Sequence, residues 1–213
     1  MLHLLKKIYY KYLSKYFDGR IKIYNRYNSY DEYLAKQIAK TTDPNRVAKW
    51  KGEEWNSKII GFRDLFDRNK IYVNKKKNAI CLGSRTGQEV FVLRELGLRA
   101  IGIDLVPFAP YTVKGDIHKL SYKNDEFDLV FTNIFDHSLY PKKFISEMER
   151  VCMSGGNIII NLQLNTPGDE YSENLLNDPS EVSKMFKNSY LMTSRNIKNT
   201  FDSMDYEFVF QKK

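Results

Sequence analysis

Hydrophobic and polar positions follow two different patterns along the chain. In residues 1–72, apolar residues recur at helical spacing, with capping candidates at Ser29 and Asp43 in front of two amphipathic stretches. In residues 73–213, short apolar runs alternate with amphipathic segments, which is the pattern of βαβ units. We therefore expect a helical N-terminal lead-in over residues 1–72 and an α/β domain with a mostly parallel sheet over residues 73–213.

Seven runs in the second part are predicted to be strands. The first five are separated by helical segments, so helices are expected on both faces of the sheet. The last two alternate apolar and polar residues, as strands near a sheet edge do. The predicted strands are 79–82, 100–104, a short run before Asp116, 127–133, 157–162, 189–197 and 204–213.

A glycine turn joins the first predicted strand to a helical segment. Gly83 and Gly87 let the backbone turn tightly and approach a ligand at the helix N-terminus, where unpaired N–H groups point outward. Seventeen residues beyond Gly87, the next strand ends in Asp104, whose carboxylate can accept two hydrogen bonds from a ribose diol. The turn alone could be a simple connection, but together with Asp104 it indicates a nucleotide-like ligand.

Three further features follow in order: Asp116 after a short strand, a strand that ends in Asn133, and a Gly-Gly turn before another strand. With the glycine turn and Asp104, this series resembles the class I S-adenosylmethionine-dependent methyltransferases, in particular their branch of small enzymes. The resemblance covers residues 79–164. It implies a methyltransferase with a Rossmann-like, seven-stranded, mostly parallel sheet and with S-adenosyl-L-methionine as cofactor.

The resemblance also implies which positions hold the cofactor. In the family, the glycine turn lies against the methionine part of the cofactor. By this resemblance, Asp104 would bind the ribose hydroxyls, and Asp116 and Ile117 would contact the edge of the adenine ring. The side chain that ends the fourth strand would lie beside the sulfonium. The implied cofactor-binding residues are Gly83, Ser84, Arg85, Gly87, Asp104, Leu105, Asp116, Ile117 and Asn133.

Two residues depart from the family pattern. Cys81 stands where the family usually has an acid, and Arg85 stands where it usually has a glycine. Loss of the acid removes a partner for the amino group of the cofactor or for the amides of the turn. Arg85 could reach the methionine carboxylate or point to solvent.

The segment after the fourth strand carries a candidate catalytic pair, Asp136 and His137. A hydroxyl acceptor is a poor nucleophile at neutral pH, and an imidazole can take its proton as the methyl group moves. Asp136 could hold the tautomer of His137, or it could contact the acceptor. In the alternative interpretation, His137 only packs under the cofactor.

The same segment bears on metals and on the class of acceptor. Some related enzymes hold a metal with Glu-x-x-Glu-His, but the matching positions here are Asn133, Asp136 and His137, so we expect no metal. Methylases of nucleic-acid bases typically carry Asn-Pro-Pro-aromatic at this point. Residues 133–136 lack both prolines, which argues against a nucleic-acid substrate.

The lead-in points to a sugar acceptor. Its sequence resembles that of methyltransferases found beside glycosyltransferases in glycan assembly, including those of large algal DNA viruses. This resemblance implies O-methylation of a sugar hydroxyl. Our specific expectation is a deoxyhexose such as rhamnose. Trp50 and Trp55 either stack on the sugar or anchor the lead-in to the core. The alternatives are a methyltransferase of a small metabolite or RNA, and an inactive cofactor-binding scaffold.

Charge is concentrated at the N-terminus. The chain has a net charge of +8, and residues 1–30 hold seven basic residues and one acid among interleaved tyrosines. This segment is either an amphipathic helix packed on the domain or a docking surface for an anionic ligand, a partner domain or a second subunit. No apolar run approaches the roughly 20 residues of a membrane span, and we expect a cytoplasmic protein.

Overall fold

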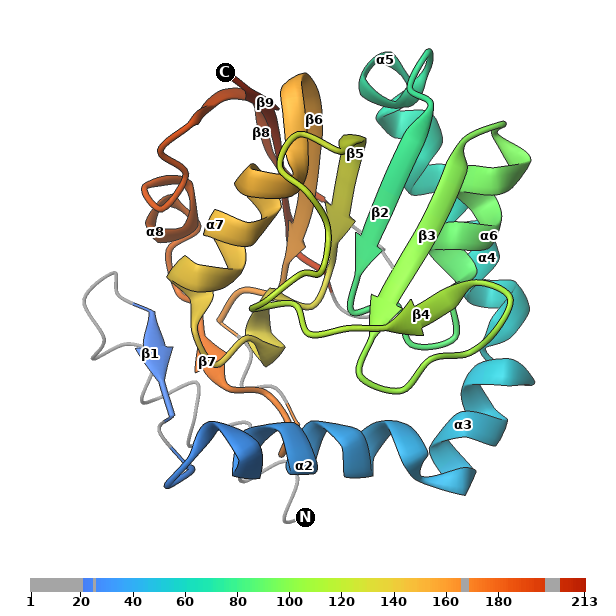
Figure 1. Ribbon diagram of the computed structural model, residues 1–213, viewed down its shortest axis with the longest axis vertical. Coiled ribbons are helices and arrows are strands. Elements are labelled where there is room, and N and C mark those ends of the chain that lie inside the picture. Colours follow the sequence, from blue (N-terminus) through green and yellow to red (C-terminus); the bar gives the residue numbers. More distant parts are fainter. Residues whose placement is uncertain (1–20, 25, 166–168, 198–203) are drawn as a thin grey trace.

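The computed structural model describes residues 21–24, 26–165, 169–197 and 204–213. Their main feature is a seven-stranded sheet in the order β4-β3-β2-β5-β6-β9-β8 (Figure 1). β9 runs antiparallel to β6 and β8, and the other neighbouring pairs are parallel, which confirms the predicted mostly parallel sheet. The strands are β2 (Asn78–Leu82), β3 (Arg99–Asp104), β4 (Thr112–Lys114), β5 (Phe127–Thr132), β6 (Cys152–Leu162), β8 (Ser189–Asn196) and β9 (Tyr206–Lys212).

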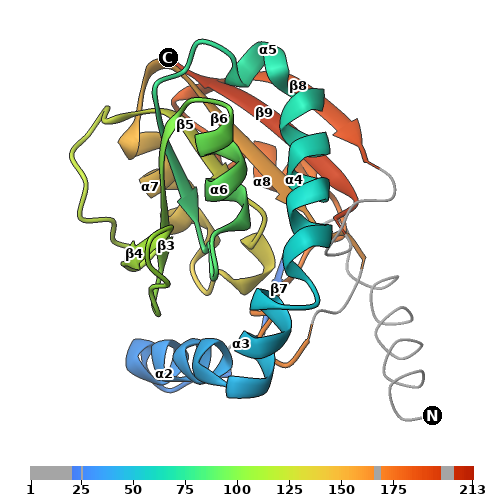
Figure 2. The same ribbon diagram turned by 90° about the vertical axis from the view of Figure 1, so that its right-hand side faces the viewer.

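Helices cover both faces of the sheet (Figures 1 and 2). Alternate residues of β2 point to opposite faces: Ile80 and Leu82 pack with α7 and α8, while Ala79 and Cys81 pack with α4 and α6. All four are almost fully buried, which explains why this strand is a continuous apolar run. The helices are α4 (Trp55–Arg68), α6 (Gln88–Glu95), α7 (Pro141–Val151) and α8 (Ser180–Ser183).

Two of the lead-in helices begin at the predicted capping residues. The Ser29 side chain accepts a hydrogen bond from the N–H of Glu32, and Asp43 accepts one from the N–H of Asn45. The helical stretch behind Asp43 divides at Gly52, whose backbone leaves the helical conformation. The helices are α2 (Tyr30–Thr42), α3 (Pro44–Lys51) and α5 (Lys70–Val73). Of these, α2 lies across the carboxyl ends of the central strands (Figure 1).

A small second sheet was not predicted. It pairs β1 (Lys22–Ile23) with β7 (Asn174–Leu175) in antiparallel register. Most of the basic, tyrosine-rich segment 1–30 lies outside the described residues, so its packing and its partner stay predictions, as does the domain division after residue 72. Among the helices that are described, none is long and apolar enough to cross a membrane.

Candidate functional site

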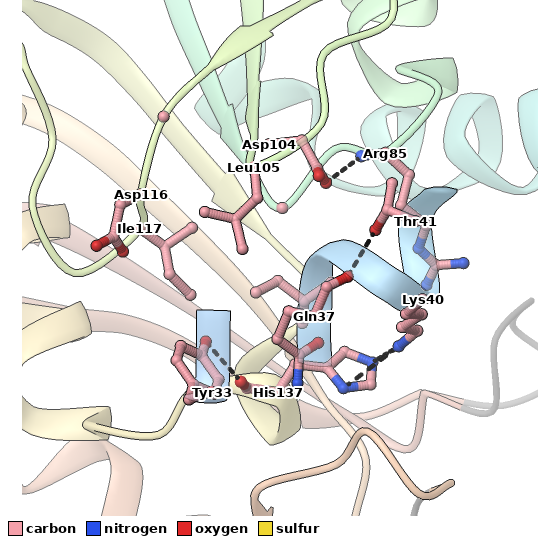
Figure 3. A pocket seen from close by; sticks show the side chains of 13 residues that line it. Tyr33, Gln37, Lys40, Thr41, Arg85, Asp104, Leu105, Asp116, Ile117 and His137 are labelled. Atoms are coloured by element: carbon pink, nitrogen blue, oxygen red, sulfur yellow. Dashed lines mark hydrogen bonds between the residues drawn. The ribbon is translucent and has the colours of Figure 1, made fainter. Parts of the chain in front are cut away.

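A pocket opens at the carboxyl ends of the strands, where the turns after β2, β3 and β4 face α2 (Figure 3). The space between the residues of this main pocket, counted together with its open mouth, is about 530 Å³. Its lining residues are Tyr33, Gln37, Lys40, Thr41, Gly83, Arg85, Asp104, Leu105, Gly115, Asp116, Ile117, Ile134 and His137.

The glycine turn brings bare backbone to one wall of this pocket. Gly83 has φ +77°, and a Cβ atom added there would lie 2.3 Å from Cγ1 of Ile134. Gly87 has φ +83°, and a Cβ atom added there would lie 2.4 Å from Cβ of Tyr111. Arg85, which replaces the usual family glycine, also adopts a left-handed conformation, with φ +42°. The turn therefore keeps the glycine-type backbone shape although it carries a large side chain.

Asp104 presents its carboxylate at the end of β3. Its two oxygens accept hydrogen bonds from the backbone N–H groups of Arg85 (2.8 Å) and Val106 (3.1 Å). The residue is 8% exposed, and burial raises the pKa of its carboxyl although these hydrogen bonds oppose the shift. Each oxygen keeps a further lone pair, so the group can accept two more hydrogen bonds from a diol.

Asp116 lines the same pocket and is held by neighbours that the sequence did not indicate. Both of its carboxylate oxygens face the hydroxyl of Tyr30, at 2.8 and 2.7 Å, and one accepts the N–H of His118. Burial opposes ionisation, but the hydrogen bonds from His118 and Tyr30 prevail and lower the pKa of Asp116 to about 2. The ring of His118 is fully buried, and its Nε2 lies 2.9 Å from the hydroxyl oxygen of Ser138.

His137 ends the short 3-10 helix η1 (Phe135–His137), and its orientation is fixed by the backbone. Nδ1 lies 2.9 Å from the carbonyl oxygen of Tyr171, so Nδ1 carries the hydrogen and Nε2 carries the lone pair. Asp136 lies 3.7 Å from Nε2 and accepts a hydrogen bond from Ser172, so the tautomer is set by Tyr171 and not by Asp136. Burial lowers the pKa of His137, and the charge of Lys40 lowers it further.

Lys40 of α2 is a site residue that sequence reasoning missed. Its Nζ lies 2.9 Å from Nε2 of His137 and 3.9 Å from Asp169 (Figure 3). Burial, together with the charge of Arg85, lowers the pKa of Lys40 to about 8. Lys40 is therefore a buried cation that begins to lose its proton close to physiological pH.

The buried face of α2 is polar, which explains the omission. Its four buried residues are Tyr33, Gln37, Lys40 and Thr41. The inward side of this helix faces a pocket and not a hydrocarbon core, and the apolar Ala39 lies on its exposed side. The repeat of these polar residues at positions i, i+4, i+7 and i+8 was the available signal.

A side pocket lies next to the main one, with Gly83 and Arg85 lining both. Its walls include Ser84, Glu89 and Asn133, so two predicted cofactor residues, Ser84 and Asn133, line the side pocket.

Two tryptophans of the lead-in pack close to this turn. Trp50 is 5% exposed, and its ring stacks 5.0 Å from the guanidinium of Arg85. Trp55 packs edge-on and tilted against Phe91 and Tyr111. These contacts favour the anchoring interpretation of both tryptophans over the sugar-stacking one.

Residues 80–160 match a family model described as a methyltransferase domain. Residues 80–160 of the chain therefore form an S-adenosylmethionine-dependent methyltransferase domain. No curated protein matches the sequence of the chain. Among solved structures, a Burkholderia thailandensis 1,6-didemethyltoxoflavin-N1-methyltransferase with bound S-adenosylhomocysteine shares the fold with a TM-score of 0.67 and 11% identity, covering 92% of this chain and 97% of that one. The PH0226 protein of Pyrococcus horikoshii shares the fold with a TM-score of 0.62 and 17% identity, and the match covers 78% of this chain and 96% of that one.

The residues of the methyltransferase fit its cofactor, S-adenosyl-L-methionine. The glycine turn leaves no room for a side chain, Asp104 has spare acceptors for a ribose, and Leu105 and Ile117 offer apolar surface to an adenine ring. Among the described residues, no group of three or more histidine, cysteine or acidic side chains could hold a metal ion. The contact that each residue makes with the cofactor stays a prediction.

Proposed function

We propose that this methyltransferase transfers the methyl group to a sugar hydroxyl and that His137 is the general base. The observation that carries the proposal is the contact between Nδ1 of His137 and the carbonyl of Tyr171, at 2.9 Å. It leaves Nε2 as the basic nitrogen, and His137 lines the main pocket, where its ring faces Lys40 of α2 (Figure 3). A base in this position suits an acceptor that must lose a proton as it is methylated.

The residues that would hold the cofactor lie along the turns after the strands. Asp104 would bind the ribose hydroxyls, Asp116 and Ile117 would contact the adenine, and Gly83 would lie against the methionine part. When bound, the cofactor supplies an electrophilic methyl group on a sulfonium. The protein's task is then to align an acceptor oxygen with that group and to exclude water, for which α2 forms the roof of the pocket.

Lys40 controls the availability of the base. In the structure its ammonium group donates to Nε2 of His137, so this nitrogen is free to accept a proton only after Lys40 loses its own, near pH 8. The acceptor hydroxyl then gives its proton to Nε2. Asp136, 3.7 Å from Nε2, stabilises the imidazolium that forms.

The roof of the pocket supports a polyhydroxy acceptor. Gln37 and Thr41 bring an amide and a hydroxyl to the pocket wall, and the ring of Tyr33 adds an aromatic face. Hydrogen-bonding groups beside an aromatic surface suit a sugar ring, which has hydroxyls at its edge and C–H groups on its face. The resemblance of the lead-in to glycan-modifying enzymes points to the same class, with a deoxyhexose as the specific candidate.

The test measures formation of S-adenosylhomocysteine from S-adenosylmethionine with a panel of deoxyhexose glycosides. Replacement His137→Gly should lower kcat by about 10²- to 10⁴-fold, and added imidazole should restore part of it, because the small base can occupy the vacated space. Affinity for S-adenosylhomocysteine should be unchanged. Full turnover by His137→Gly would refute the base assignment, and absence of turnover on every sugar despite cofactor binding would refute the sugar acceptor.

A further inference from the structure

The acid that the family usually has at the end of the first strand is replaced here by Cys81. This thiol is fully buried in β2, and burial raises its pKa well above the usual value, so it carries no charge at neutral pH. The Ser84 hydroxyl donates to the carbonyl oxygen of Cys81 at 2.9 Å, and Ser84 and Glu89 line the same side pocket. An acid is therefore present in this region, but it comes from the first turn of α6.

Glu89 borders a space at the glycine turn. It is 4% exposed and lines the side pocket together with Gly83, Ser84 and Asn133. Gly83 also lines the main pocket, so the side pocket continues from the place where the cofactor's thioether would lie. A group that extends from the main pocket past the turn would meet Glu89.

The charges around the side pocket are of both signs. The side pocket is lined by the carboxylate of Glu89 and by two cationic residues, Lys58 of α4 and Arg85 of the turn. Lys58 is 7% exposed. Burying a carboxylate is costly unless a cation or hydrogen-bond donors compensate it. Burial raises the pKa of Glu89 to about 7, although its hydrogen bond with Ser84 and the charges of Lys58 and Arg85 act to lower it. The compensation within the protein is therefore incomplete.

We propose that Glu89 binds the α-ammonium group of the cofactor's amino-acid end and so replaces the acid absent at Cys81. An α-amino acid carries one positive and one negative group on the same carbon. The side pocket offers one carboxylate, with Arg85 as the cation for the carboxylate of the ligand, because Lys58 already pairs with Glu54 at 3.4 Å. The inference rests on the class of cofactor and is independent of the acceptor and of His137.

Calorimetric titration with two ligands tests the proposal. S-adenosylhomocysteine has the amino-acid end, whereas 5′-methylthioadenosine keeps the nucleoside and the thioether without it. Replacement Glu89→Gln should weaken S-adenosylhomocysteine binding about 10- to 100-fold, the loss expected for a hydrogen bond to a charged group. Binding of methylthioadenosine should be unchanged. The matched control is Glu95→Gln at the end of the same helix, where the side chain is 41% exposed and pairs with Arg63.

Equal weakening of both ligands would overturn the proposal, because Glu89 would then only support the turn. Unchanged binding of S-adenosylhomocysteine would overturn it as well. If the Glu89 variant fails to fold, the wild-type protein still decides, through the protons exchanged on binding in buffers of different ionisation enthalpy.

The proton count follows from the groups that face Glu89, which are Cys81 from β2, Ser84 and Arg85 from the turn, and Lys58 from α4. With a pKa of about 7, Glu89 is roughly half protonated at pH 7 before binding, and an incoming ammonium group favours the ionised form. Binding of S-adenosylhomocysteine at pH 7 should therefore release about half a proton more than binding of methylthioadenosine. Equal proton release by the two ligands would refute the ion pair.

Discussion

The floor of the main pocket, formed by the turns after β2, β3 and β4, is built by backbone, whereas its roof, formed by α2, is built by side chains. In the floor, Gly83 and Asp104 are fixed by backbone conformation and by hydrogen bonds to backbone N–H groups. In the roof, Gln37 bonds the carbonyl of Tyr171 across 134 positions of sequence. The floor suits a ligand shared by many enzymes, and the roof suits an acceptor particular to this one.

A single methyl group added to the floor should strongly weaken cofactor binding. Replacement Gly83→Ala places a Cβ atom 2.3 Å from Cγ1 of Ile134 at φ +77°, so both overpacking and backbone strain oppose it. Together these cost about 2–5 kcal/mol, and affinity for S-adenosylhomocysteine should fall by on the order of 100-fold or more. Calorimetric titration, with circular dichroism to verify folding, measures the loss.

Gly97→Ala is the matched control for that substitution. Gly97 also has positive φ, +88°, but among the described residues no atom lies within 4 Å of the added Cβ. The variant should lose about 1–2 kcal/mol of stability and keep full cofactor affinity. If both variants bind S-adenosylhomocysteine like the wild type, the glycine turn does not contact the ligand.

Removing the charge of Asp104 should have the next largest effect. Asp104→Asn keeps the shape of the side chain, but it replaces an acceptor oxygen by an amide donor opposite the ribose diol. We expect S-adenosylhomocysteine to bind about 10- to 100-fold more weakly, as for loss of hydrogen bonds to a charged group. Asp67→Asn, at a side chain that is 79% exposed, is the control and should bind normally. Normal binding by Asp104→Asn would show that Asp104 does not bind the ribose hydroxyls.

The contrast between floor and roof also explains how far the sequence could be interpreted. The glycine turn, Asp104 and Asp116 each follow a strand directly, so local pattern and family resemblance located all of them at one edge of the sheet. The polar repeat of α2 indicates that Lys40 faces inward, but no local pattern indicates its contact with His137, because the two residues are far apart in the sequence and meet only where α2 crosses that edge. The β1–β7 pairing escaped prediction for a related reason, since each strand has only two residues.

The substitution at Cys81 shows a second limit. Position by position, the motif has lost its acid. In three dimensions, Glu89 lies on the next helix and lines the same turn, so the chemical group can be kept while its place in the sequence changes. A motif records which residue usually supplies a function, whereas the pocket requires only a carboxylate within reach.

In the roof, Lys40→Met should change how turnover depends on pH. With wild-type protein and an active acceptor, turnover should rise toward pH 8 as Lys40 releases Nε2 of His137. In the variant Nε2 is free at all pH values, so the rise should move below pH 7, and turnover at pH 7 should increase by up to about tenfold. Lower turnover with an unchanged pH profile would show that Lys40 positions the acceptor instead. Lys36→Met, one turn earlier on α2 and more exposed, is the control.

Stability measurements sharpen the same comparison without an acceptor. The pKa of Lys40 is about 8 in the folded protein and 10.5 in a free side chain, so between these values the unfolded state binds more protons. The free energy of unfolding of the wild type should therefore rise with pH across this window, relative to Lys40→Met. Parallel denaturation curves of the two proteins from pH 7 to pH 10 would show that Lys40 is not a strained, buried cation.

The smallest effect is expected where floor and roof meet, at the hydrogen bond from Tyr30 to Asp116. Tyr30→Phe removes the hydroxyl and keeps the ring, which stacks on Tyr140 at 5.6 Å. We expect a loss of about 1 kcal/mol of stability at pH 7 and no loss of cofactor affinity, because Asp116 gains a free acceptor for the adenine.

The stability loss caused by Tyr30→Phe should depend on pH through the ionisation of Asp116. Asp116 has its pKa lowered to about 2, so its contribution to stability is present above its ordinary pKa of 3.8 and is lost as pH falls toward 2. Without the Tyr30 hydroxyl the folded-state pKa of Asp116 rises toward 3.8, and the stability difference between wild type and Tyr30→Phe should narrow as pH falls from 4 to 2. A difference that is constant over this range would place the effect in packing, and weaker cofactor binding would make Tyr30 part of the floor.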